Sequence, residues 1–132
     1  MHFKFKTNQS TNERGAIRTL LTGINNQGQI IGFYRNGGNV AIGFLLENGI
    51  AKDLVYPGAA HTRPFGINDA GDIVGEYFDH SGVAHGFLKK KGEYLTLDFP
   101  GSFDTALLGI NNSGTIVGTY DGYSHGLIAT PD

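Results

Sequence analysis

The chain repeats one twelve-residue segment three times at a constant interval. The copies read GINNQGQIIGFY at 23–34, GINDAGDIVGEY at 66–77 and GINNSGTIVGTY at 109–120, so that each copy begins 43 residues after the one before it. At this offset nine positions are identical in all three copies: Gly15/Gly58/Gly101, Thr19/Thr62/Thr105, Gly23/Gly66/Gly109, Ile24/Ile67/Ile110, Asn25/Asn68/Asn111, Gly28/Gly71/Gly114, Ile30/Ile73/Ile116, Gly32/Gly75/Gly118 and Tyr34/Tyr77/Tyr120. A fixed period of this length indicates a repeat architecture, in which one supersecondary unit is stacked or arranged in a ring.

Each repeat has the sequence pattern of β-strands and short turns. The segment IVGEYF at 73–78 alternates two sets of side chains, which is the period of two expected when successive residues point to opposite faces of a sheet. No segment keeps the 3.6-residue period of an amphipathic helix over the ~11 residues that a helix normally spans. We therefore predict an all-β fold with four strands per repeat, which in the second copy are 62–67, 72–78, 83–90 and 93–99.

Residues 68–71, Asn-Asp-Ala-Gly, have the composition of a tight turn between the first two strands of a repeat. Asparagine at the first position bonds its own backbone two residues further on, and glycine at the last position accepts a positive φ. The carboxylates of Asp69 and Asp72 also suggest a calcium site, but the other two copies have no carboxylate at either position. Because turn chemistry explains all three copies, we predict a turn and no metal site.

Glycine is unusually frequent, at 21 of 132 residues, where an average chain has near 7%. Such a content without the period of collagen indicates many turns and short strands. Gly75 lies inside a predicted strand, where glycine costs stability unless a neighbour needs the space. We expect an aromatic ring, Tyr77 or Phe87, to lie across it.

The bulk composition is that of one globular domain covering residues 1–132. Hydrophobic residues make up 39% and charged residues 17%, and the formal net charge is -2. The longest basic run is the three lysines at 89–91, so nothing indicates the clustered basic surface of a nucleic-acid binder. Cysteine is absent, which excludes disulfides, thiolate metal ligands and cysteine nucleophiles. No apolar stretch approaches the ~20 residues that span a bilayer, and we predict no membrane partner.

The two ends of the chain bear on how the repeats close. We divide the chain into repeats at approximately 23–65, 66–108 and 109–132, the last completed by residues 1–22. The C-terminal SHGLIATPD matches the third strand of a repeat, AHGFLKKKG, so the last copy lacks a fourth strand. The N-terminal HFKFKT alternates and can supply it, as an N-terminal strand does when it completes the last blade of a β-propeller.

The segments LDFPGSFDTALLGINNSGTIVGTY and GINDAGDIVGEYFDHSGVAHGFL resemble the HAF family of bacterial extracellular repeats. Those repeats carry a His-small-Phe element followed, after an LDxPG-like strand, by GIN-x-x-G-x-IVG. The element is HGF at 85–87, HGL at 125–127 and IGF at 42–44. The resemblance covers nearly the whole chain and implies propeller-like β structure in secreted or surface proteins, without a particular reaction. The N-terminal MHFKFKTNQS has no apolar core of a secretory signal, so the localisation stays open.

The resemblance also favours one of three alternative architectures, which are a β-propeller, a β-trefoil and a β-prism. A β-trefoil or a β-prism closes as a monomer with threefold pseudo-symmetry. A propeller needs about four to eight blades, so three repeats predict a homo-oligomer, most simply a homodimer with six blades around a twofold axis. We favour the propeller, because the repeats that the chain resembles occur in longer arrays, which a strictly threefold fold does not accommodate.

His85 and His125 belong to the repeated element. Such residues can act as metal ligands or as a general base. We favour a structural role, with a ring nitrogen bonding a neighbouring backbone or turn group. Isoleucine at position 42 removes any threefold histidine site.

Positions at which the copies differ are candidates for chemistry that occurs once. The segments that enter the first strand read RGAIRTLL, PGAAHTRPF and PGSFDTALL, in which Arg18, His61 and Asp104 are equivalent. Arg63 follows two residues after His61. In a propeller these residues line one mouth of the central channel, where they can hold a ligand by charge-assisted hydrogen bonds. The alternative is variation of a solvent-exposed loop.

The second strand provides another variable place. Its varying face carries two sets of equivalent residues, Phe33/Glu76/Thr119 and Arg35/Phe78/Asp121. Tyr77 and its equivalents recur beside them, and a tyrosine near a carboxylate or an arginine is typical of sugar sites. The alternative is that these tyrosines pack between blades.

Three functions of different classes follow. The favoured one is a lectin-like module that binds carbohydrate or another small polar ligand through Arg18, His61, Arg63, Glu76, Tyr77 and Asp104. The second is an enzyme in which His61 acts with Asp104 or Glu76 as acid and base at the channel mouth. The third is a structural or interaction scaffold without a small-molecule site. A nucleophile elbow and a phosphate-binding loop are both absent from the sequence, and we predict no cofactor.

Overall fold

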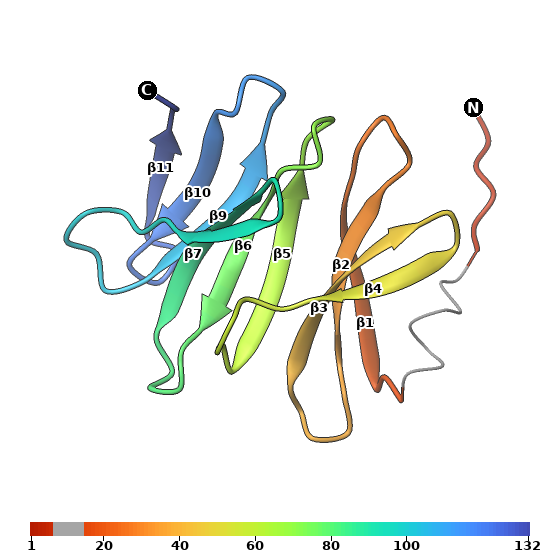
Figure 1. Cartoon of the computed structure of the whole chain (residues 1–132), viewed down its shortest axis with the longest axis horizontal. Coiled ribbons are helices and arrows are strands. Elements are labelled where there is room, and N and C mark those ends of the chain that lie inside the picture. The colour runs from red at the N-terminus through yellow and green to blue at the C-terminus, as the bar shows by residue number, and fades with distance from the viewer. Residues whose placement is uncertain (7–14) are drawn as a thin grey trace.

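The computed structural model describes residues 1–6 and 15–132, and in that part of the chain it contains strands but no helix (Figure 1). The strands form three separate antiparallel sheets, each with its strands in chain order. The first sheet consists of β1 (Arg18–Ile24), β2 (Ile30–Arg35), β3 (Ala41–Glu47) and β4 (Ile50–Leu54). The second consists of β5 (His61–Ile67), β6 (Ile73–Phe78), β7 (Ala84–Lys90) and β8 (Glu93–Thr96). The third consists of β9 (Thr105–Ile110), β10 (Ile116–Tyr120) and β11 (His125–Ala129).

The all-β class is therefore confirmed, as are the four strands predicted for the second copy. The largest difference is at β8, which ends at Thr96 where the prediction ran to residue 99. The pairing with β7 continues for one backbone hydrogen bond, from Leu97 N to Gly86 O, at 2.8 Å. Beyond it the side chain of Asp98 replaces the ladder, because its Oδ1 accepts from Gly86 N at 2.9 Å.

Among the described residues, the third sheet has three strands and β11 is its free edge. Residues 1–6 form no strand, and Arg18–Ile24 pairs with β2 of the first sheet. The predicted completion of the last repeat by residues 1–22 also involves residues 7–14, which lie outside the described part of the chain. Within the described part, no segment with membrane-spanning length and hydropathy forms a helix.

The repeated GIN turns have the predicted geometry. Gly71 has a φ of +83° and donates from its N–H to Asn68 O at 3.1 Å, which closes the turn. Asn68 Oδ1 accepts from the backbone N–H of Asp72 at 2.9 Å. The carboxylates of Asp69 and Asp72 bond to protein groups, since Asp69 accepts from neighbouring turns and Asp72 from Lys90 Nζ at 3.0 Å. Among the described residues, no cluster of three metal-ligating side chains forms.

These turns also join one sheet to the next. Asn25 Nδ2 donates to Asn68 O, and Asn68 Nδ2 donates to Asn111 O, both at 3.0 Å. The next position adds further bonds, because Asn26 N donates to Asp69 Oδ1 and Asp69 N to Asn112 Oδ1, both at 2.8 Å. Residues one repeat apart thus make the same contact twice, and we call this series the turn ladder. It explains why the asparagine is identical in all three copies.

Apolar side chains fill the two junctions between sheets, and the two junctions are built from equivalent residues. The first junction contains Ile31, Leu54, Ile67, Ile73 and Phe87, and the second contains Val74, Leu97, Ile110, Ile116 and Leu127. In each case the preceding sheet contributes a residue of its second strand and one at or just after its fourth strand, and the following sheet contributes from its first three strands. Four of the five equivalent pairs lie 43 residues apart and Phe87/Leu127 lie 40 apart, so successive sheets pack through corresponding positions of the repeat.

Gly75 fits the expectation of an aromatic neighbour, and the ring is that of Phe87 and not that of Tyr77. Phe87 is the cross-strand partner of Gly75. A Cβ at position 75 would come within 2.8 Å of the Phe87 ring and would also overlap the carbonyl oxygen of Arg63. Glycine is needed here because the strand backbone and the ring occupy the space of a side chain.

The sheets follow one another as an open series (Figure 1). β5 contacts β1, β2 and β3 of the first sheet, and β9 contacts β5, β6 and β7 of the second. The described strands of the first and third sheets make no comparable contact with each other. The chain thus has two exposed sheet faces, one at each end of the series.

Candidate functional site

The variable residues His61 and Arg63 lie on β5 at the end opposite to the turn ladder. Cross-strand pairing places His61 beside Phe78 and Arg63 beside Glu76 on β6. Alternation along β5 puts His61, Arg63 and Phe65 on one face, while the intervening Thr62 and Pro64 are buried on the other. The face with His61 and Arg63 is therefore the partly exposed face of β5.

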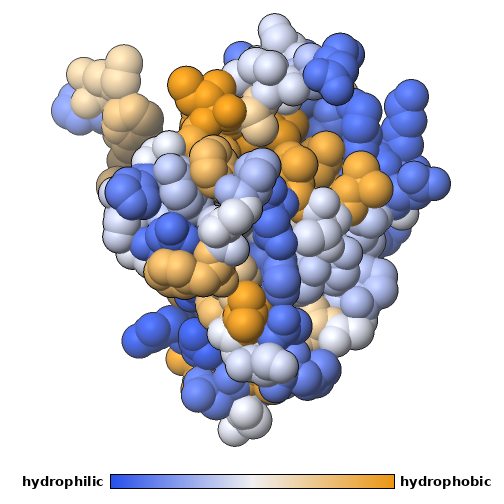
Figure 2. Space-filling model, turned by 90° about the vertical axis from the view of Figure 1, so that its left-hand side faces the viewer, coloured by the Kyte–Doolittle hydropathy of each residue, from blue (hydrophilic) through white to orange (hydrophobic). Residues whose placement is uncertain are grey.

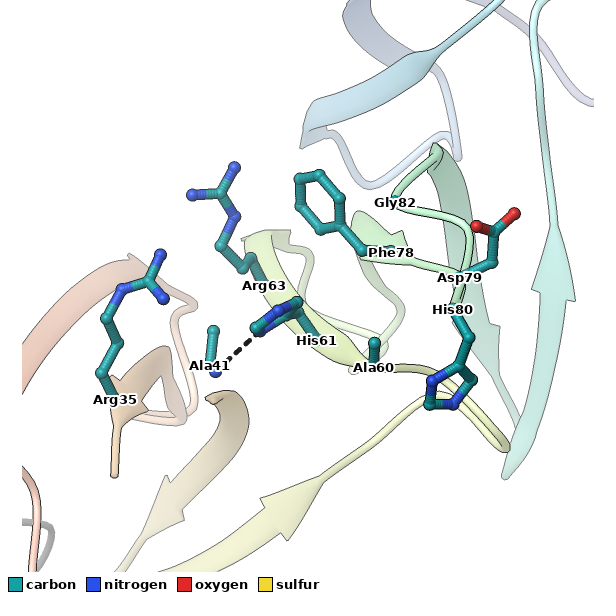
Figure 3. A pocket seen from close by; sticks show the side chains of 9 residues that line it. All are labelled: Arg35, Ala41, Ala60, His61, Arg63, Phe78, Asp79, His80 and Gly82. Atoms are coloured by element: carbon teal, nitrogen blue, oxygen red, sulfur yellow. Dashed lines mark hydrogen bonds between the residues drawn. The ribbon is translucent and has the colours of Figure 1, made fainter. Parts of the chain in front are cut away.

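A pocket of about 370 Å³ opens at this end, between the first and second sheets (Figure 3). The first sheet contributes Arg35, at the end of β2, and Ala41, at the start of β3. The second sheet and the segments next to it contribute the remaining residues, which are Ala60, His61, Arg63, Phe78, Asp79, His80 and Gly82. Arg35 and Arg63 extend past the His61 ring in the same general direction in Figure 3.

His61 is held in one tautomer by a backbone group of the neighbouring sheet. Ala41 N donates to His61 Nδ1 at 3.0 Å, so the neutral ring carries its proton on Nε2. Burial lowers the pKa of His61, and the positive charges of Arg35 and Arg63 lower it further. The ring is therefore neutral near pH 7, and its Nε2–H is a hydrogen-bond donor.

The guanidinium group of Arg35 places a positive charge in the same pocket as the His61 Nε2–H donor. Arg35 donates from Nη1 to the backbone oxygen of Asn39 at 3.3 Å, and within the described residues it forms no ion pair. Asp79, the carboxylate of the pocket, accepts from the backbone N–H groups of Ser81 and Val83 and bonds His85 Nε2 at 2.9 Å. Asp79 is thus engaged in its own hairpin, and among the described residues no carboxylate pairs with the guanidinium of Arg35.

Arg63 separates this pocket from a second one. Its guanidinium forms an ion pair with Glu76, whose side chain is almost fully buried. The rings of Phe33, Phe65 and Phe78 surround the guanidinium carbon at 5.7, 5.9 and 5.3 Å from their centroids. Burial raises the pKa of Glu76, although Arg63 beside it acts in the opposite direction. Arg63 therefore stabilises a buried carboxylate and also presents a face to each pocket.

The second pocket, of about 230 Å³, lies between the second and third sheets. Asp104 and Glu76 line it together with Arg63, Thr119 and Tyr123. Asp104 Oδ1 accepts from the backbone N–H of Gly122 at 2.7 Å, and Tyr123 Oη lies 3.4 Å from Glu76 Oε1. Each carboxylate is thus already hydrogen-bonded within the protein.

The structure brings together four of the six residues that the sequence predicted to form a ligand site. His61, Arg63, Glu76 and Asp104 line two adjacent pockets at one end of the sheets, with Arg63 common to both. The proposed acid and base are divided between them, because His61 lines the first pocket and Glu76 and Asp104 line the second. Arg18 lines neither pocket.

Tyr77 also lies elsewhere, in the junction between the first and second sheets. It stacks on Tyr56 at 3.7 Å between ring centroids and on His85 at 5.0 Å. Tyr120 makes the equivalent stacks with Phe99, at 3.9 Å, and His125, at 5.0 Å. Tyr77 and Tyr120 thus follow the alternative interpretation, in which the tyrosines pack between sheets, whereas Tyr34 packs on Phe44 within the first sheet.

The histidine of the repeated element takes part in these stacks. In the second sheet, His85 Nδ1 bonds Asp98 Oδ2 at 2.8 Å and its Nε2 bonds Asp79 Oδ2 at 2.9 Å. Burial acts to lower the pKa of His85, but the two carboxylates outweigh it and the pKa is raised. His85 therefore links a hairpin to the segment after β8, which is a structural arrangement.

Comparison with models of known protein families gave no match, and comparison with curated proteins gave none at a significant level. The function is therefore argued from the geometry of the pockets. Three residues that line the pockets were not predicted as site residues from the sequence: Ala41, Asp79 and Tyr123. Ala41 contributes only its backbone N–H, for which no side-chain signal exists. Tyr123 lies in the shortened hairpin of the third sheet and has a φ of +65°, a conformation that the sequence does not reveal.

Proposed function

We propose that this protein is a binding module for a small, oxygen-rich anionic ligand, such as an acidic sugar. The observation that carries the proposal is the neutral His61, which is fixed by Ala41 N as an Nε2–H donor next to two arginines. A carboxylate accepts charge-assisted hydrogen bonds from guanidinium groups, and hydroxyl groups accept from an imidazole N–H. The ring of Phe78, edge-on to His61 at 5.8 Å, supplies an apolar wall.

The pocket has the dimensions and composition of a small-molecule site. Its volume of about 370 Å³ lies within the range of about 300–1,000 Å³ common for such sites. It combines apolar surface with a few convergent polar groups, which is the usual composition of a ligand pocket. The charges around the pocket favour an anionic ligand. Glu76 neutralises Arg63, and Asp79 is bonded to His85. Arg35, by contrast, has no acidic partner among the described residues.

Calorimetric titration with galacturonate and glucuronate mono- and disaccharides, and with their neutral galactose and glucose counterparts, tests this function. We expect the uronates to bind and the neutral sugars to bind more weakly. Removing one charge-assisted hydrogen bond with Arg35→Ala should weaken uronate binding about 10- to 100-fold, and His61→Ala should weaken it by a similar factor. Arg18→Ala, which removes an arginine outside both pockets, is the matched control and should bind like the unmodified protein.

Two results would count against the binding function. One is that no uronate or neutral sugar in the series binds. The other is that a uronate binds and the His61→Ala and Arg35→Ala variants retain its affinity, because binding would then occur elsewhere.

We further propose that the sheets are blades of a β-propeller and that two copies close into a six-bladed homodimer. The exposed ends of the series support this assembly. Val117 on the third sheet is 48% exposed, whereas the equivalent Ile31 and Val74 are 0% exposed because each is covered by the next sheet. On the first sheet, Ile24 is 67% exposed, whereas the equivalent Ile67 is 8% exposed beneath the preceding sheet.

The two exposed faces are the two halves of one junction. The third sheet presents the residues that a preceding sheet contributes, and the first sheet presents those that a following sheet contributes. Figure 2 views the molecule from the end where the third sheet lies and shows hydrophobic groups gathered among polar ones. Val117, Ile128 and Leu108 are exposed apolar residues of that sheet. A second copy, placed with its first sheet against this face, would bury both sets.

The turn ladder ends in the same complementary way. Asn68 donates to the next turn and accepts from the previous one. Among the described residues, Asn111 Nδ2 donates to no group, and Asn25 O accepts from Gly28 N of its own turn but from no preceding turn. The donor end of one copy matches the acceptor end of another, so the ladder can continue across the junction in a closed ring. Such a ring carries two copies of the His61 pocket.

A further inference from the structure

The free edge of the third sheet retains a glycine that the isolated chain does not need. A Cβ at Gly43 would come within 2.5 Å of Leu54 O in the fourth strand and 2.9 Å of Pro64 Cδ in the next sheet. At Gly86, a Cβ would overlap Leu97 O, just beyond the fourth strand, and come within 2.9 Å of Leu107 Cγ in the next sheet. At the equivalent Gly126 on β11, a Cβ would meet nothing within 4 Å.

Two neighbours are therefore missing at Gly126, a fourth strand and a following sheet. The proposed dimer supplies the second of them. Leu21 is the first-sheet equivalent of Pro64 and Leu107, and it is exposed where those two are buried. Leu21 of the partner subunit would thus approach Gly126 across the junction. A fourth strand beside β11 would fill the space that Leu54 O and Leu97 O occupy at Gly43 and Gly86.

Residues 2–6, His-Phe-Lys-Phe-Lys, have the features of that strand. They alternate apolar and polar side chains, and Phe3 and Phe5 are 74% and 95% exposed in the structure. The segment is described but forms no strand. Two exposed phenylalanines on one face of a potential strand indicate a surface that another element covers.

The order of the chain indicates which sheet this segment joins. In the first two sheets, the fourth strand leads directly into the first strand of the following sheet, from β4 to β5 and from β8 towards β9. By the same rule, the segment before β1 belongs to the sheet that precedes the first sheet. In the proposed ring, that sheet is the third sheet of the partner subunit. Figure 1 agrees, because residues 1–6 lie on the right of the molecule, beside the first sheet, whereas β11 lies on the left.

We propose that residues 2–6 of each copy form the fourth strand of the third sheet of the other copy, antiparallel to β11. The inference rests on the proposed dimer and adds to it a reciprocal exchange of strands. It accounts for three observations together: the unpaired edge of β11, the glycine at position 126 and the exposed phenylalanines. It also removes an open sheet edge, which would otherwise be a template for uncontrolled pairing.

A mixing experiment with two full-length variants tests the exchange. One variant, Phe3→Asp with Phe5→Asp, has a defective segment and an intact edge. The other, Gly126→Val, has an intact segment and an edge on which a side chain blocks the approach of a fourth strand. Each variant alone should lose dimer mass in sedimentation equilibrium, with at least about 100-fold weaker association, because a charge or an overlap is buried at both junctions. All three positions are open to solvent in the single chain, so the thermal unfolding of the separated chains should not change.

An equal mixture of the two variants should regain dimer mass. If strands are exchanged, the mixed dimer has one junction with an intact edge and an intact segment. If each segment folds back onto its own β11, both junctions of the mixed dimer are defective and the mixture stays monomeric, which overturns the exchange. Ile50→Glu is the matched control, because it places a charge at an exposed apolar position whose equivalent, Glu93, is already acidic. This control should dimerise normally.

The remaining outcomes separate the exchange from the ring itself. If the unmodified protein is monomeric, the proposed dimer fails, and the exchange fails with it. If the unmodified protein is a dimer and the Phe3→Asp/Phe5→Asp variant associates equally tightly, the dimer stands and the exchange is overturned.

Discussion

Replacing Val117 with aspartate should separate the proposed dimer into single chains that remain folded. In one chain this side chain is half exposed on the free face of the third sheet, so a carboxylate there stays hydrated. In the closed ring it would occupy the position of Ile31 and Val74, both of which are fully buried between sheets. Burial of an unpaired charge costs several kcal/mol, and we expect the dissociation constant of the dimer to rise at least about 100-fold.

Sedimentation equilibrium measures the dissociation constant, and thermal unfolding of the separated chains shows that they stay folded. Val74→Asp is the contrasting variant, because the same change at the equivalent position inside the chain should unfold the protein. A Val117→Asp protein that keeps the mass of a dimer at the same concentrations would show that this face is not the junction.

Replacing Arg63 with methionine should destabilise the fold by about 3–5 kcal/mol, which is the usual cost of leaving one member of a buried ion pair without its partner. Glu76 is 1% exposed and has Arg63 as its charged partner. The double variant Arg63→Met/Glu76→Leu removes both charges and should recover most of the lost stability. Urea unfolding of the two variants beside the unmodified protein measures both effects.

The destabilisation by Arg63→Met should also depend on pH. Burial raises the pKa of Glu76 in the folded protein, and losing Arg63 raises it further. A carboxyl group whose pKa is higher when folded than when unfolded binds more protons in the folded state, so its contribution to stability falls as the pH rises above the ordinary value. The loss of unfolding free energy in the Arg63→Met variant should therefore be small at acidic pH and grow towards neutral pH. A deficit that is equal at acidic and neutral pH would contradict this account of Glu76.

Much of the fold follows from the sequence, because the pattern of turn and strand residues occurs three times. The turn at Asn68 to Gly71 and the strand IVGEYF occur with the same spacing in each copy, so one local pattern predicts three sheets. The buried positions are also repeated, which is why Ile67 and Ile110 fill equivalent places in the two junctions. The end of β8 was less accessible to sequence reasoning, because the Asp98 side chain takes over from the backbone ladder there.

The candidate site was only partly predictable, for a physical reason. Alternation along a strand places His61 and Arg63 on the same face, but it does not say which residues of another sheet meet them. The partner of His61 Nδ1 is a backbone N–H from the first sheet. Every residue except proline has such a group, so the sequence does not indicate which one bonds His61. Arg18 occupies the position equivalent to His61, yet it lies on the first sheet, against which the described residues place no preceding sheet to form a pocket. Tyr77 lies in the junction between two sheets, where its ring stacks on that of Tyr56.

The mass of the unmodified protein in solution tests the central claim most directly, which is that three equivalent sheets leave two complementary ends for a second copy to close. Sedimentation equilibrium over a range of micromolar concentrations should give twice the chain mass of 14.2 kDa. A mass of one chain at every concentration would contradict the proposed closure of two copies into a six-bladed ring.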